Sequence, residues 1–325
     1  GITFEYSNLA YALLGQIVAK TAGESFQRYI TRELLQPLGM KDTVWEYSDV
    51  PAGKLALGYR LVNSEWKLEP LLHDGVYGAM GGLLTTMNDF ARYVSFHLAA
   101  WPARNDADNG IVRRASVREM HKPSKFTGLA ADAKNRAGEL VPSVSAYAYG
   151  LGWTADSKRV VRVGHSGGLP GFGSIYRFYP EHGLGVIAFA NLTYAGTGVA
   201  VGRASAILIE DAKLPRRVQP PSAILVARTK QIAELVQSWD PKLADALVAE
   251  NFFPDRPRAA WMKLAQETLA KAGAIKSVGA ITPENQLRGT FPLIGEHGRV
   301  NVFFTLTPEK DARLQELRLT FVKNP

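Results

Sequence analysis

The chain has 325 residues, 46% hydrophobic and 21% charged, and a formal net charge of +8. This composition is ordinary for a globular protein, and the length allows two domains. The basic residues are scattered in short groups without an interleaved aromatic stripe, which argues against nucleic acid as a partner. The chain contains no cysteine, which excludes disulfides, thiol catalysis and cysteine-type zinc sites. No apolar run approaches the roughly 18 residues of a membrane span, so we expect no transmembrane segment.

The first two thirds of the chain read as helices followed by strands. Helix formers with glycine or proline near the ends predict helices at residues 9–22, 25–36, 87–100 and 115–121. Residues 56–70 predict a β-hairpin, and the rest of 102–146 is polar and expected to be irregular. Strand-like runs follow at residues 148–156, 160–168, 173–180 and 184–191. Because the last run does not alternate, we expect it to be buried on both faces. A helix near 197–212 closes this unit.

A change of pattern near residue 213 indicates a second domain. Residues 213–222 (KLPRRVQPPS) combine charges with adjacent prolines and are predicted to be a linker. Beyond them, helical spacing predicts three helices, and alternating strands follow, the last with Leu317, Leu319 and Phe321 on one face. The predicted fold class is therefore α+β, with domains at residues 1–212 and 223–325.

Two short motifs in the first domain suggest chemistry. Tyr6-Ser7-Asn8 directly precedes a helical run, and His165 opens the glycine-rich stretch GHSGGLPGFGS at 164–174. A tyrosine acts as a general base near neutral pH only if its pKa, normally near 10, falls by about three units, which requires nearby cations. His165 is a candidate cation if the fold brings the two motifs together. Taken alone, each residue is more often structural.

Together these motifs resemble the serine β-lactamase and penicillin-binding-protein superfamily, in its class C-like branch of β-lactamases, esterases, DD-peptidases and D-aminopeptidases. That family carries Ser-x-x-Lys, Tyr-x-Asn, and Lys-Thr-Gly or a His-x-Gly variant. Here YSN at 6–8 matches the second signature and HSGG at 165–168 matches the third. The resemblance spans about residues 1–212. It implies a β-lactamase/transpeptidase-like fold, with an antiparallel sheet flanked by helices and an incomplete N-terminal part.

The resemblance also implies roles for individual residues. Tyr6 is expected to be the general base, with His165 supporting it electrostatically. Asn8 is expected to bind the substrate amide, and Ser166 and Gly167 to lie at the substrate-binding strand. The amide of Gly168 is expected to donate to the oxyanion.

The nucleophile is expected to lie outside the chain. In the family, Ser-x-x-Lys lies well upstream of Tyr-x-Asn, and only five residues precede Tyr6 here. The chain does contain Ser64-Glu65-Trp66-Lys67, but in the wrong order and within a predicted hairpin turn, so we interpret Ser64 as a chance match. We therefore expect a missing N-terminal segment, supplied by a separate or cleaved chain or by a swapped partner.

Two functions remain open at this point. The first is a serine hydrolase acting through an acyl-enzyme on esters, D-residue peptides or amides, or β-lactams; the histidine variant favours esterase or D-peptidase over true β-lactamase. The second is a catalytically inactive homologue that binds a small molecule or peptide. The resemblance implies no metal, nucleotide or organic cofactor, and a periplasmic or secreted location.

The remaining histidines show no metal-ligand spacing, and we interpret them as structural: His73, His97, His121, His182 and His297. Residues 223–325 resemble, more weakly, the cone of ketosteroid isomerase and nuclear transport factors. This resemblance implies an accessory or dimerisation domain, so a homodimer is a further expectation.

Overall fold

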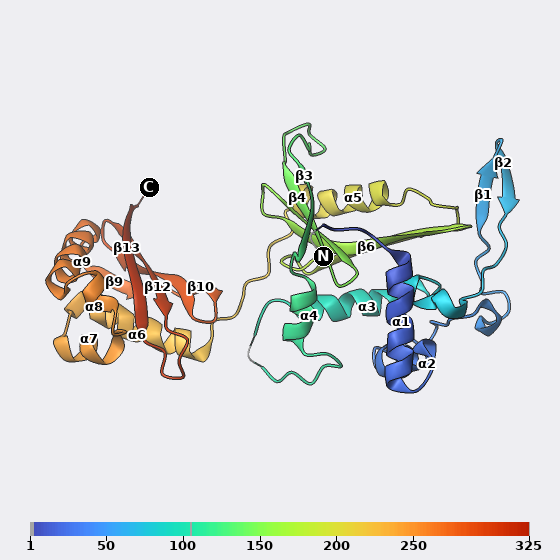
Figure 1. The fold of residues 1–325 in the computed structure, drawn as a ribbon. Coiled ribbons are helices and arrows are strands. Elements are labelled where there is room, and N and C mark those ends of the chain that lie inside the picture. The colour runs from blue at the N-terminus through green and yellow to red at the C-terminus, as the bar shows by residue number, and fades with distance from the viewer. Residues whose placement is uncertain (1–2, 105, 325) are drawn as a thin grey trace. The chain divides into compact units, whose positions relative to one another are not determined.

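A computed structural model describes residues 3–104 and 106–324, with residue 77 described in its backbone only. The chain forms two compact units (Figure 1). The first comprises residues 1–102 and 107–217, and the second comprises residues 218–325 with the short segment 103–106. Their boundary lies inside the segment predicted to be a linker, whereas the grouping of 103–106 with the second unit has no sequence signal. Within the described residues, no helix combines the length and apolarity needed to cross a membrane.

The first unit is built on a six-stranded antiparallel sheet whose strands follow one another in chain order. These strands are β3 (Lys125–Ala130), β4 (Ser143–Ala148), β5 (Leu151–Asp156), β6 (Val161–Leu169), β7 (Phe172–Tyr179) and β8 (Leu184–Ala190). The last four confirm the four predicted runs. The expectation of irregular structure between the helix near 120 and residue 146 was wrong, because β3 and β4 lie there. β3 is mostly exposed and therefore carries no apolar alternation; its pairing with β4 defines it.

Two helices cover the faces of this sheet, α3 (Met87–Ala99) and α5 (Gly198–Ala206) (Figure 1). Phe178 of β7 is fully buried in a core that includes Val94 of α3. Ile175 points to the other face, beside Gly198 of α5. β8 contacts both helices, yet Phe189 remains 38% exposed. We predicted that this strand would be buried on both faces, and the structure shows that it is only partly buried.

The other elements of the first unit are mainly short helices and one hairpin. They are α1 (Asn8–Ala22), α2 (Phe26–Ile30), the π-helices η1 (Thr31–Leu35) and η4 (Ile207–Asp211), the 3-10 helices η2 (Tyr47–Asp49) and η3 (Gly75–Met80), α4 (Arg114–Met120), and the hairpin β1 (Tyr59–Val62) with β2 (Glu65–Leu68). Gly23 ends α1 with a left-handed φ of 71°, as its position in the sequence predicted. Each predicted helix and the hairpin are present, although the second helix continues as a π-helix.

The second unit packs helices against a curled antiparallel sheet. Its elements are α6 (Ala223–Ser238), α7 (Pro241–Leu247), α8 (Phe252–Asp255), α9 (Arg258–Ala272), β9 (Ile275–Val278), β10 (Thr282–Asn285), β11 (Arg288–Gly295), β12 (Gly298–Leu306) and β13 (Leu314–Lys323). Leu317, Leu319 and Phe321 all pack against one core, which confirms the predicted face. The short helix α8 and the strands β9 and β10 were not predicted, because segments of four residues show no periodicity.

A chain of buried rings ties α3 and α4 to the sheet. The Nε1–H of Trp101 donates to Nδ1 of His121 over 2.8 Å, so His121 carries its proton on Nε2. That proton donates to Nδ1 of His97 over 2.8 Å. His97 is fully buried and stacks on Phe178. Burial lowers the pKa of His97 to about 4 and that of His121 to about 3.

We predict that this histidine pair makes the protein less stable in mild acid. The folded pKa values lie below the ordinary value of 6.5, so the unfolded chain binds more protons as pH falls below 6.5. The free energy of unfolding should fall by about 2 kcal/mol per buried histidine between about pH 7 and about pH 5. Urea unfolding at several pH values measures this. His97→Gln should flatten the slope, whereas the exposed His297→Gln should not; equal slopes in all three proteins would contradict the prediction.

Candidate active site

The first predicted motif forms the start of α1. Ser7 caps the helix, and its hydroxyl accepts a hydrogen bond from the amide of Ala10 over 3.1 Å. Asn8 is the first helical residue and is exposed. Tyr6, just before the cap, is 52% exposed. The local sequence thus fixes a helix end that presents the Tyr6 ring to its surroundings.

The second predicted motif lies where β6 loses one of its two neighbours. β5 pairs with β6 from Val161 to Gly164, whereas β7 pairs with β6 from Val163 to Leu169. His165 is therefore the first residue beyond the paired stretch on one edge. Residues 166–168 follow on this edge and are exposed. An exposed strand edge can bind an extended substrate backbone through main-chain hydrogen bonds.

The fold brings the two motifs together. The rings of Tyr6 and His165 stack with centroids 5.9 Å apart and planes 28° apart. Sequence reasoning missed a third ring, Tyr147 of β4, whose centroid lies 6.1 Å from Tyr6 and 5.9 Å from His165. Its strand lies in the region predicted to be irregular, so no pattern singled it out.

Hydrogen bonds fix the protonation pattern of this cluster. Nδ1 of His165 lies 2.6 Å from the backbone oxygen of Ser166, which can only accept, so Nδ1 carries a proton. Nε2 lies 3.1 Å from the Tyr147 hydroxyl. In the neutral imidazole, Nε2 is the acceptor and Tyr147 the donor. Burial raises the pKa of Tyr147, and the neighbouring Tyr11 and Tyr6 raise it further, so Tyr147 keeps its proton.

The glycines after His165 are required by their protein neighbours. A Cβ on Gly168 would lie 2.2 Å from the ring of Tyr194, and a Cβ on Gly167 would lie 2.6 Å from the hydroxyl of Ser174. We expected bare backbone here because a substrate approaches it. The structure adds a reason within the chain, since any side chain would displace Tyr194 or Ser174.

Ser64 lies apart from this cluster. It occupies the tip of the β1–β2 hairpin, which projects away from the sheet region where the chain begins (Figure 1). Asn63 and Ser64 both have positive φ, 51° and 65°, as in a type I′ hairpin turn. The Ser-x-x-Lys match is therefore part of a tight, exposed turn.

The described parts of the chain also contain no group of three or more His, Asp or Glu residues arranged to hold a metal ion. The site is thus a cluster of aromatic and imidazole rings beside an open strand edge. Such a cluster can hold and transfer a proton.

Comparison with known proteins identifies the family and the fold. Residues 1–210 match the beta-lactamase family. Protein flp of Staphylococcus aureus is 28% identical over 195 residues, which cover 59% of this chain and 34% of that protein. Beta-lactamase-like protein 2 of Dictyostelium discoideum is 37% identical over 94 residues, which cover 29% of this chain and 17% of that protein.

A solved structure extends the similarity of fold to both units. The octameric penicillin-binding protein homologue from Pyrococcus abyssi aligns with a TM-score of 0.53 and 19% identity, over 99% of this chain and 62% of that one. The chain therefore belongs to the beta-lactamase family, a superfamily of hydrolases, and has its α+β fold. It spans about a third of the length of the curated relative flp.

We predict that the Tyr147 hydroxyl holds the His165 ring. Tyr147→Phe should remove the donor to Nε2, which shifts the ¹⁵N resonance of Nε2 and costs about 1 kcal/mol of stability. Long-range ¹H–¹⁵N NMR of the imidazole measures the first effect and urea unfolding the second. Tyr149→Phe, on an exposed ring two residues away, should leave both unchanged. An unaltered Nε2 resonance in Tyr147→Phe would show that the hydrogen bond is not made.

Proposed function

We propose that the chain supplies the general base of a serine hydrolase that acts through an acyl-enzyme. Its proposed substrates are esters, or peptides and amides with D-residues, in preference to β-lactams. The observation that carries this proposal is the half-exposed Tyr6 ring stacked on His165 beside the open edge of β6. This arrangement places the Tyr6 side chain where a serine hydroxyl can approach it, and it leaves the edge of β6 open to the substrate. The preference for esters and D-residue substrates over β-lactams follows from the family resemblance, because the third signature has His165 where true β-lactamases mostly have lysine.

In the proposed reaction, Tyr6 reacts as the phenolate and accepts the proton of the serine hydroxyl as the serine oxygen attacks the carbonyl carbon. It later returns the proton to the leaving group. The amide of Gly168 donates to the oxygen that becomes negative. The ring of His165 contacts both Tyr6 and Tyr147, and its Nδ1–H donates to the Ser166 oxygen. Tyr147, which keeps its proton, orients the imidazole.

The nucleophilic serine, in this proposal, belongs to a segment that packs on α1 outside these 325 residues. Leu9, Leu13 and Ile17 recur every four residues along α1 and are 59%, 56% and 59% exposed. They form an apolar stripe that begins three residues after Tyr6. A segment covering this stripe would bring its side chains next to the Tyr6 hydroxyl.

Labelling tests the location of the nucleophile. Intact-mass analysis with a fluorophosphonate probe should show no adduct on the 325-residue chain. A longer form that carries an upstream Ser-x-x-Lys should show one adduct, which peptide sequencing should map to that serine. An adduct at Ser64 would overturn our interpretation of the hairpin. No adduct in either protein would favour the alternative of an inactive, binding homologue.

We predict that Tyr6→Phe in the longer form lowers the acylation rate about 10²- to 10⁴-fold, the range typical for loss of a general base. Stopped-flow acylation with a chromogenic ester, or with a penicillin, measures it. Tyr149→Phe is the matched control and should acylate at the wild-type rate. A Tyr6→Phe rate within threefold of wild type would rule out the proposed base.

A further inference from the structure

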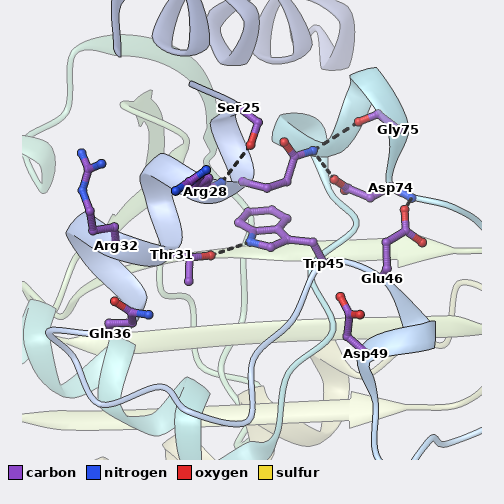
Figure 2. A pocket seen from close by; sticks show the side chains of 11 residues that line it. Ser25, Arg28, Thr31, Arg32, Gln36, Trp45, Glu46, Asp49, Asp74 and Gly75 are labelled. Atoms are coloured by element: carbon purple, nitrogen blue, oxygen red, sulfur yellow. Dashed lines mark hydrogen bonds between the residues drawn. The ribbon is translucent and has the colours of Figure 1, made fainter. Parts of the chain in front are cut away.

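A polar cavity of about 680 Å³ lies beyond the C-terminal end of α1, in a part of the first unit that the proposed reaction does not use. α2 and η1 form one wall, and the segments around residues 45–49 and 74–75 form the other (Figure 2). Trp45 lines its centre. The indole Nε1–H donates to the Thr31 hydroxyl over 2.9 Å, so the exposed part of this ring offers apolar surface.

The ionised groups of the lining are unequal in number. Three carboxylates, of Glu46, Asp49 and Asp74, face two guanidinium groups, of Arg28 and Arg32. Both arginines are already engaged by Glu24, which lies outside the lining, at 3.5 Å and 2.5 Å. Arg32 also pairs with Glu33 over 2.8 Å. The cations of the cavity are therefore neutralised from outside it.

The carboxylates have weaker partners. Glu46 meets Nδ1 of His73 at 3.0 Å and accepts from the amide of Asp74 at 3.2 Å. Asp49 is exposed, and within the described residues no ion pair is recorded for it. The lining thus carries one more carboxylate than guanidinium groups.

Asp74 is the unusual member of this lining. It is only 8% exposed, and the amide of Gln27 donates to its Oδ2 over 2.5 Å. Its other oxygen, Oδ1, is buried without a hydrogen-bond partner. Burial raises the pKa of the Asp74 carboxyl, and the neighbouring Glu46 carboxylate raises it further. Oδ1 lies against Gly78 and Gly82, so a cation in the cavity would stabilise the buried carboxylate through its charge and not through a hydrogen bond to this oxygen.

We propose that this cavity binds a small organic cation, an alkylammonium group whose N–H donors reach Glu46, whose charge lies beside Asp74 and whose carbon chain lies on Trp45. Charge-assisted hydrogen bonds to carboxylates supply affinity for the ammonium, and the indole attracts cations and covers the alkyl chain. An organic cation fits better than a bare metal ion, because the described lining includes no cluster with metal-ligand geometry.

Isothermal titration of the 325-residue chain with n-pentylammonium tests this proposal. Two probes of similar length distinguish the contribution of the ammonium charge from that of the alkyl chain. 1-Pentanol should bind at least tenfold more weakly than n-pentylammonium, and pentanoate should not bind. The indole Nε1–H resonance of Trp45, followed by ¹H–¹⁵N NMR, should shift with pentylammonium and so locate it in the cavity. Tighter binding of pentanoate would assign the cavity to anions through Arg28 and Arg32 and overturn the proposal. An unmoved Trp45 resonance would also overturn it.

Substitutions in the lining provide a second test of the proposed binding. Asp74→Asn should weaken pentylammonium binding at least tenfold, since it removes the buried charge but keeps the shape of the side chain. Asp49→Asn changes an exposed residue of the lining without touching the core and should weaken binding about threefold. Asp211→Asn removes a carboxylate outside the lining and should bind as wild type does. Unchanged affinity in Asp49→Asn and in a folded Asp74→Asn would refute the proposal.

Discussion

The pairing of β6 with its neighbours is the constraint on which the candidate active site depends. At Val163 and Gly164 the strand is paired on both edges, and beyond Gly164 only β7 pairs with it. Backbone hydrogen bonds fix this register, and a slip of one residue would turn His165 to the other face of the sheet. The change from two neighbours to one therefore places His165, and the glycines after it, on a rigid strand with an open edge. The side chains of Tyr194 and Ser174 lie against those glycines.

Burial gives the aromatic side chains of the cluster different environments. Tyr147 is partly buried among other phenols, its pKa is raised, and its proton is directed to His165. Tyr6 is half exposed at the end of a helix and faces no such restriction on access. Two tyrosines beside one histidine can therefore perform separate tasks, one orienting the imidazole and the other exchanging a proton. This division follows from desolvation, which disfavours the charged form of a buried phenol.

The two sites described here lie toward opposite ends of α1. Tyr6 precedes the helix, and the polar cavity begins at Ser25, just after Gly23 ends it. A helix of 15 residues spans about 22 Å, so a ligand in the cavity leaves the aromatic cluster free. Both ends are defined locally, by a serine cap at one and a left-handed glycine at the other. The same helix exposes the apolar stripe on which a nucleophile-bearing segment is proposed to pack.

Local sequence determined the helix ends, the hairpin, strands β5 to β8 and the chemistry-bearing motifs at Tyr6 and His165, because caps, turns and periodicity act over a few residues. It did not identify β3, which is mostly exposed, or β4, which pairs with β3 and β5. For the same reason it missed Tyr147, which reaches His165 although β5 lies between their strands. The cavity, too, exists only because Trp45 and Asp74, distant in sequence from Arg28, meet in the fold. Tertiary structure alone decided these contacts, since each joins segments that carry no local signal for one another.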